Sequence, residues 1–341
     1  MTRSALATAA REPSGQLVGL LTAGAAHAPE DADGQANPLP VALVALDRLG
    51  AAPERLVAFA QRHGPRLQAA PPAQPWPAGD PWPDRLGRPE AWPAYRALFT
   101  EWIEQEGASD MLGQVLPGLM PGVGAAGFQG LIRTASAVRC GHLGALADGL
   151  AWWACRHLPL GALHHPLAGT ARVPATEDPE ALLRELPARR SRQRSGSDPL
   201  LDVARDGRVN RVAARLLVDG HTLERLARTA AFAYAHTGNF TALHLVTGTH
   251  ALRVLTRFLD EPLVAWAWYW QAFAHAVVAA RLQPAAAVEP RPWKSLIARA
   301  LTQDDPHAVT LVESCLEEER AYARRGETLW RLAASRAPSS R

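Results

Sequence analysis

Three histidines lie in one apolar stretch of the chain, residues 230–259. They are His236, His244 and His250, set among Ala, Leu, Val and Phe. A buried imidazole costs free energy unless its ring nitrogens find hydrogen-bond partners, so these residues need an explanation. His244 and His250 lie roughly 120° apart around a straight helix, so they cannot face one point unless Gly248 loosens the turn. Two interpretations stay open: core histidines bonded to their neighbours, or a ligand or metal pocket to which one of them contributes.

Two further histidines stand in settings that suit a site. His307 follows Asp-Asp-Pro, in which an aspartate can cap a helix and proline suits its first turn. His275 follows Trp266, Trp270 and Phe273, whose spacing places aromatic rings along one helix face. That stripe is either ordinary core packing or an aromatic wall for a flat polycyclic ligand.

The elements that position these side chains are predicted to be helices. Apolar residues make up 48% of the chain, with Ala and Leu dominant and β-branched runs scarce. We predict a helix over Leu39–Leu49, a second helix that begins at Pro53, and a helix stop with a new N-cap just before Phe240. With 341 residues and no fixed-period repeat, we expect a single all-α domain over 1–341, built of many helices around a buried central pocket.

Two irregular segments interrupt this pattern. Residues 64–89 are rich in Pro and Trp, which predicts either a lid over a pocket or a surface strap anchored by Trp76 and Trp82. Residues 187–199 carry the basic run RRSRQRSGS, which favours a solvated flexible loop over a phosphate-binding patch, since no aromatic residues interleave. The vicinal pair His164-His165 lies in a turn flanked by Gly and Pro, with a metal pair as the minority interpretation.

Several classes of function have little or no support in the sequence. The formal net charge is +3, and the basic residues are almost wholly arginine. We interpret the arginine content as compositional bias, so we expect no nucleic-acid partner. Cys140, Cys155 and Cys315 are unclustered, which fits a reducing cytoplasm and gives no zinc spacing. No signal peptide opens the chain, and Val264 to Ala280 is better read as a buried helix than as a membrane span. We find no GxSxG elbow, phosphate loop or HExxH motif, and the glycines at Gly122 follow no strand.

Four segments, in the same order, resemble the questin oxidase-like family, helical proteins that include fungal polyketide-tailoring oxygenases. These segments are PLPVALVALDRLGAAPERLVAF, LPGLMPGVGAAGFQGLIRTASAVRCGHLGALADGLAWWA, FTALHLVTGTHALR and DDPHAVTLVESCLEEE. The resemblance runs from about Asn37 to Glu319. It implies histidines drawn from several helices, which in some members hold a non-haem iron, and a reduced nicotinamide (NADPH) in some members.

The sequence departs from the family pattern where ligands are expected. Relatives usually carry a histidine near Val41, histidines at the places of Gln129 and Ser136, and a lysine at the place of Thr310. Amide and hydroxyl oxygens are weak iron ligands, so we expect iron to be bound weakly or not at all. If any metal is held, His244, His250 and His307 would hold it.

The leading hypothesis is a cytoplasmic oxidoreductase of secondary metabolism, which inserts oxygen into a polycyclic, quinone-like substrate or cleaves its ring. His244, His250 and His307 would form the polar centre, and Gln129 would hydrogen-bond the substrate or a water. We expect substrate contacts from Phe128, Arg133, Trp266, Trp270 and His275.

Two alternatives come from other classes. The first is a non-catalytic member that binds a small aromatic molecule and has lost its metal site. The second is a helical scaffold or RNA-associated protein that uses Arg189, Arg190, Arg192 and Arg194.

Overall fold

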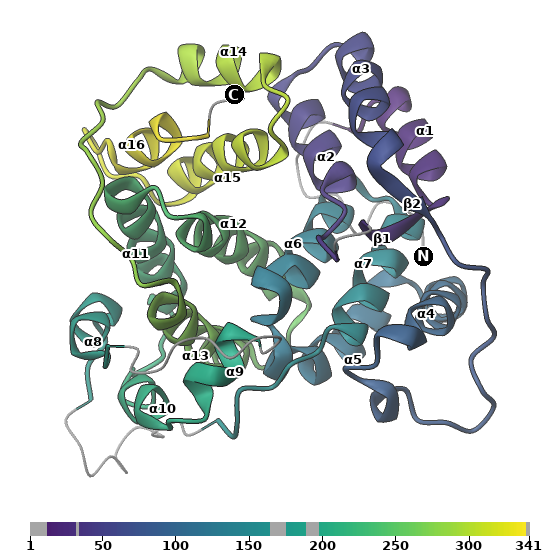
Figure 1. Ribbon diagram of the computed structural model, residues 1–341, viewed down its shortest axis with the longest axis horizontal. Coiled ribbons are helices and arrows are strands. Elements are labelled where there is room, and N and C mark those ends of the chain that lie inside the picture. Colours follow the sequence, from purple (N-terminus) through teal and green to yellow (C-terminus); the bar gives the residue numbers. More distant parts are fainter. Residues whose placement is uncertain (1–11, 32–33, 164–174, 189–197, 339–341) are drawn as a thin grey trace.

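The chain folds into helices that pack around one hydrophobic core (Figure 1). The computed structural model describes residues 12–31, 34–163, 175–188 and 198–338. Within these ranges there are 16 α-helices and one two-stranded sheet. No helix among them is long and apolar enough to cross a membrane. The helices are α1 Gly15–Gly24, α2 Leu39–Leu49, α3 Pro53–His63, α4 Trp92–Glu106, α5 Ala108–Leu119, α6 Ala125–Cys140, α7 Leu143–Cys155, α8 Pro179–Glu185, α9 Pro199–Ala204, α10 Arg208–Ala213, α11 Thr222–Thr237, α12 Phe240–Leu255, α13 Pro262–Ala280, α14 Trp293–Thr302, α15 Pro306–Tyr322 and α16 Leu329–Ser335.

The helix boundaries with local signals are confirmed. The helix predicted over Leu39–Leu49 is α2, and Pro53 opens α3 at a position where its missing N–H forfeits no bond. Gly238, with φ +59°, ends α11, and the Asn239 side chain accepts hydrogen bonds from the first backbone N–H groups of α12. The apolar segment at Val264–Ala280 is the buried helix α13, as predicted.

Four helices bring distant parts of the chain together. In Figure 1, α6 and α12 lie side by side near the centre, with α2 and α15 above them. Helix α6 packs on α2 and α12, and α15 packs on both α2 and α12. These four helices therefore place residues from the beginning, middle and end of the chain within reach of one another.

The predicted all-α fold is confirmed, and one short antiparallel sheet accompanies the helices in the described part of the chain. Strands β1 (His27–Asp31) and β2 (Leu67–Ala69) pair with His27 opposite Ala69 and Asp31 opposite Leu67. At five and three residues the strands are too short for a period-two pattern to be recognised, although Leu67, Gln68 and Ala69 do alternate. The two strands flank the hairpin of α2 and α3, which brings them together.

The Pro/Trp-rich segment is anchored on α4 through Trp76 and Trp82, and its residues Pro71 and Ala73 line a hollow together with α4, so the strap and the lid both stay predictions. The Trp76 ring lies 4.8 Å from the Tyr95 ring, and the Trp82 ring lies 6.2 Å from the Phe99 ring. The Tyr95 hydroxyl also donates to the Trp82 carbonyl at 2.7 Å. The pair His164-His165 and the basic run with Arg189, Arg190, Arg192 and Arg194 lie outside the described residues.

Candidate functional site

A small hollow opens where α2, α6, α12 and α15 meet, and we call it the His244 hollow. The centre of a water-sized sphere can occupy about 20 Å³ of this space, so the hollow has room for one or two water molecules. Its buried floor consists of Val41, Ile132, Leu243, His244 and Thr247, and its half-buried rim consists of Pro38, Gln129, Pro306, His307 and Thr310.

His244 is held neutral at the floor of this hollow. Burial lowers the pKa of its imidazole to about 3, and the neighbouring His307 ring contributes in the same direction. The side-chain amide nitrogen of Gln129 lies 3.0 Å from His244 Nε2 and donates to it. Since Nε2 then accepts, the ring proton lies on Nδ1. His244 therefore retains a single donor, its Nδ1–H, and carries no charge at neutral pH.

His307 approaches His244 from the first turn of α15. The carboxylate of Asp305 caps this helix, accepting from the His307 backbone N–H at 2.8 Å, and one of its oxygens lies 3.5 Å from His307 Nδ1. The His307 and His244 ring centroids are 5.5 Å apart. Two imidazoles from different helices thus share one hollow, beside an amide from a third.

An exposed aromatic ring flanks both imidazoles. The Phe240 ring packs edge-on against His244 at 4.6 Å and against His307 at 4.7 Å, and 56% of Phe240 is exposed. Phe240 was not among the residues predicted from the sequence to belong to a site. Its signal was the i, i+4 spacing from His244, which places both side chains on one face of α12.

Gln129 is aimed at His244 by a left-handed turn inside α6. Ala126, Gly127 and Phe128 have φ values of +47°, +66° and +65°, and the regular helix follows them. A Cβ at Gly127 would lie 3.2 Å from His244 Nδ1, so the backbone also packs directly against the imidazole. Left-handed backbone costs roughly 1–2 kcal/mol at each non-glycine residue, so tertiary packing must hold this turn.

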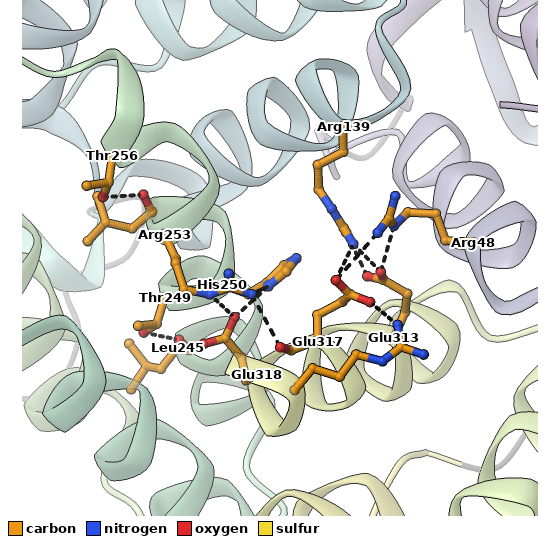
Figure 2. A network of polar contacts seen from close by, with 12 residues as sticks. Arg48, Arg139, Leu245, Thr249, His250, Arg253, Thr256, Glu313, Glu317 and Glu318 are labelled. Carbon is orange, nitrogen blue, oxygen red and sulfur yellow. Dashed lines mark hydrogen bonds and ion pairs between the residues drawn. The ribbon is translucent and has the colours of Figure 1, made fainter. Parts of the chain in front are cut away.

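His250 lies in a different environment, the Glu313 cluster (Figure 2). Its Nδ1 lies 2.7 Å from a carboxylate oxygen of Glu318, to which Arg253 also donates at 2.8 Å. Helix α12 continues without distortion past Gly248, whose missing side chain admits the Tyr269 hydroxyl. The structure therefore does not bring His250 to the hollow. The Glu313 cluster consists of Arg48, Arg139, His250, Arg253, Glu313, Glu317 and Glu318.

The residues expected to contact substrate are not among those that line the His244 hollow. They are engaged elsewhere within the described ranges. The Phe128 ring packs 5.2 Å from the Tyr269 ring, Arg133 pairs with Asp148, Trp266 donates to Thr256, Trp270 donates to the Ala213 carbonyl, and His275 Nδ1 lies 2.7 Å from the Gln271 carbonyl oxygen. Ser136 lines a separate, smaller hollow beside Arg133 and Asp148.

The side chains at the hollow do not fit a non-haem iron. Such a site usually needs three good donors, of which at least one is a carboxylate when two are histidines. His244 Nε2 already accepts from Gln129, and the nearby carboxylates of Asp304 and Asp305 are engaged by arginines and by the helix cap. Among the residues that the structure describes, no three His, Cys, Asp or Glu are grouped to hold a metal ion.

Comparison of the sequence with family models gives one match that spans most of the chain. The family model described as questin oxidase-like matches residues 36–315 of the chain. No curated protein matches the sequence. The matched range includes every residue that lines the hollow, and it contains the positions Val41, Gln129 and Thr310, where the family resemblance implied other ligands.

Proposed function

We propose, since this chain belongs to the questin oxidase-like family, that the His244 hollow binds the polar edge of a flat, quinone-like aromatic molecule without a resident iron. One observation carries the proposal: Gln129, His244 and His307 come from three distant motifs and meet in one hollow beside an exposed phenylalanine. At the positions where the family resemblance implies further ligands, this chain carries apolar, amide and hydroxyl side chains, namely those of Val41, Gln129, Ser136 and Thr310.

The chemistry of the hollow suits a carbonyl or hydroxyl group. Neutral imidazole and amide groups both donate and accept hydrogen bonds, so they satisfy an oxygen that enters from solvent. With room for only one or two waters, the hollow takes the oxygen-bearing edge of a ligand and not its rings. The rings then lie across the rim, where the exposed face of Phe240 offers an aromatic contact.

Binding of a hydroxyanthraquinone tests the proposal by calorimetry. Phe240→Ala removes the aromatic rim and should weaken binding roughly tenfold, the upper end of what one aromatic pair contributes. Phe232→Ala is the matched control, because Phe232 is also exposed and also packs on the histidine four residues later, His236. Equal effects of the two variants, or no binding by the unaltered protein, would contradict the proposal.

Oxidative turnover is the second candidate function. It is favoured by the two imidazoles that remain at family motif positions, His244 and His307, and by their meeting in one hollow. Oxygen uptake with anthraquinones, measured with and without added iron(II), is the direct test. Uptake that disappears in His244→Ala would establish an enzyme, whereas binding without uptake under either condition would leave a binding protein.

A further inference from the structure

The lining of the His244 hollow is partly polar but contains no permanently charged side chain. The ten residues that line it include no Arg, Lys, Asp or Glu. Elsewhere a buried carboxylate is met by arginine, as Glu313 is by Arg48 and Arg139. The hollow therefore has no counter-ion of its own for a charged ligand.

The charges nearest to the rim already have partners. Asp304 pairs with Arg55 at 3.1 Å and with Arg62 at 3.1 Å. The Asp305 carboxylate caps α15 and lies 3.5 Å from His307 Nδ1, so it is engaged within the protein. An anionic ligand would gain little from these groups.

We infer that the His244 hollow selects the neutral form of its ligand and rejects the corresponding anion. A carbonyl or un-ionised hydroxyl is satisfied by amide and imidazole groups, whereas a phenolate or carboxylate loses its hydration without meeting a cation. This inference rests on the proposed function, which it narrows to uncharged quinones and un-ionised phenols.

Two naphthoquinones of nearly equal size test it. At pH 7, 2-methyl-1,4-naphthoquinone is neutral and 2-hydroxy-1,4-naphthoquinone is an anion. We expect equilibrium dialysis to show at least roughly tenfold tighter binding of the neutral compound, because an unpaired charge is costly to desolvate. Covalent reaction with the protein is not expected to interfere, since all three cysteines are buried.

A charge placed at the rim should offset the preference for the neutral compound. Thr310→Lys puts a cation on the half-buried rim, and Thr310→Met is the matched variant with an uncharged chain. The lysine variant should bind the hydroxy compound about tenfold more tightly than the methionine variant does.

The outcomes separate the two proposals. If both naphthoquinones bind alike to the unaltered protein, and Phe240→Ala weakens both, the inference of charge selection fails and the proposed function stands. If neither compound binds, or if Phe240→Ala changes neither affinity, the proposed function fails and the inference falls with it.

Discussion

Helices α2, α6, α12 and α15 form two polar regions, one lined by uncharged groups and the other held together by ion pairs. In the His244 hollow, a neutral histidine meets an amide, and no charged side chain lines the space. In the Glu313 cluster, a histidine meets a glutamate within a network of arginines and glutamates (Figure 2). Arg48 and Arg139 point from α2 and α6 to Glu313 on α15.

The difference shows how a helix can carry two histidines for unrelated reasons. His250 is stabilised by direct partners inside the protein, and it makes a contact with Glu318 that holds α12 against α15. His244 has one partner in Gln129 and lies at a space that a ligand can enter. The Glu313 cluster stabilises the fold through contacts between helices, although His250 Nε2 and one Glu318 oxygen have no partner among the described residues. The His244 hollow instead offers hydrogen-bonding capacity to a ligand that enters it.

The largest effect is expected from breaking the Glu313 cluster. Arg139→Met removes one guanidinium from a carboxylate that is almost wholly buried. Breaking a buried ion pair costs about 3–5 kcal/mol, and we expect about 3 kcal/mol because Arg48 still pairs with Glu313. Unfolding in urea measures it. Gln129→Leu, on the same helix but at the hollow, is the control and should cost about 1 kcal/mol; equal losses would erase the contrast between the two regions.

The Arg139→Met variant should also change the acid sensitivity of the protein. Burial alone would raise the pKa of Glu313, but Arg139, through its charge and its hydrogen bond, lowers it to about 2 from an ordinary 4.5. This carboxylate therefore contributes stability that is present above pH 4.5 and is lost as pH falls through 2. The variant should show a shallower loss of stability over that window.

An intermediate effect is expected from the neutral state of His244. Its pKa lies at about 3 in the folded protein and at an ordinary 6.5 in the unfolded chain. Between these two pH values the imidazole is protonated in the unfolded chain and neutral in the folded protein. Stability should therefore fall as pH drops from 6.5 towards 3, by about 2 kcal/mol at pH 5.

Comparison of unfolding at pH 7 and pH 5 measures this contribution. His244→Asn should lose about 2 kcal/mol of the pH dependence. Leu243→Ala destabilises the same buried floor without removing a titrating group, and it should keep the pH dependence of the unaltered protein. A His244→Asn variant with unchanged pH dependence would show that His244 is not held neutral.

The smallest effect is expected from the left-handed turn that aims Gln129. Gly127→Ala adds a Cβ at φ +66° and 3.2 Å from His244 Nδ1, so it should destabilise by about 1–2 kcal/mol and weaken ligand binding. Ala126→Gly removes the strain of φ +47° at an exposed position. We expect it to raise the free energy of unfolding by about 0.5 kcal/mol, because the relief of strain exceeds the cost of the more flexible unfolded chain. Thermal unfolding compares the two; a stabilised Gly127→Ala variant would show that the turn is not strained.

The elements with local signals were the predictable part of the fold. The residues that start and stop α2, α3 and α12 act through neighbours within one turn, and their helices begin and end where the sequence indicates. The left-handed turn at Gly127 has no such signal, because packing against His244 and Tyr269 holds a backbone that two of its three residues disfavour.

The candidate site was predictable only in part, because its residues meet partners that are distant in the sequence. Spacing around a helix indicated that His244 and His250 face different directions, but it did not reveal Glu318, which is 68 residues from His250. The family resemblance led to Gln129, His244 and His307, whose roles stay predictions although the structure places them together. Phe240 was missed because an aromatic residue at the start of a helix is common and carries no chemistry by itself.

The contact between α2 and α15 has a consequence for how the protein is made. Arg48 and Glu313 are 265 residues apart in sequence. In a growing chain on the ribosome, the cluster residues of α2, α6 and α12 therefore lack their glutamate partners until α15 has been synthesised. Folding that depends on such distant contacts is slow, and its intermediates expose surface that favours aggregation. A nascent chain that stops before Pro306 lacks one wall of the hollow and the three glutamates of the cluster, so we expect chaperones to engage this protein until α15 has emerged.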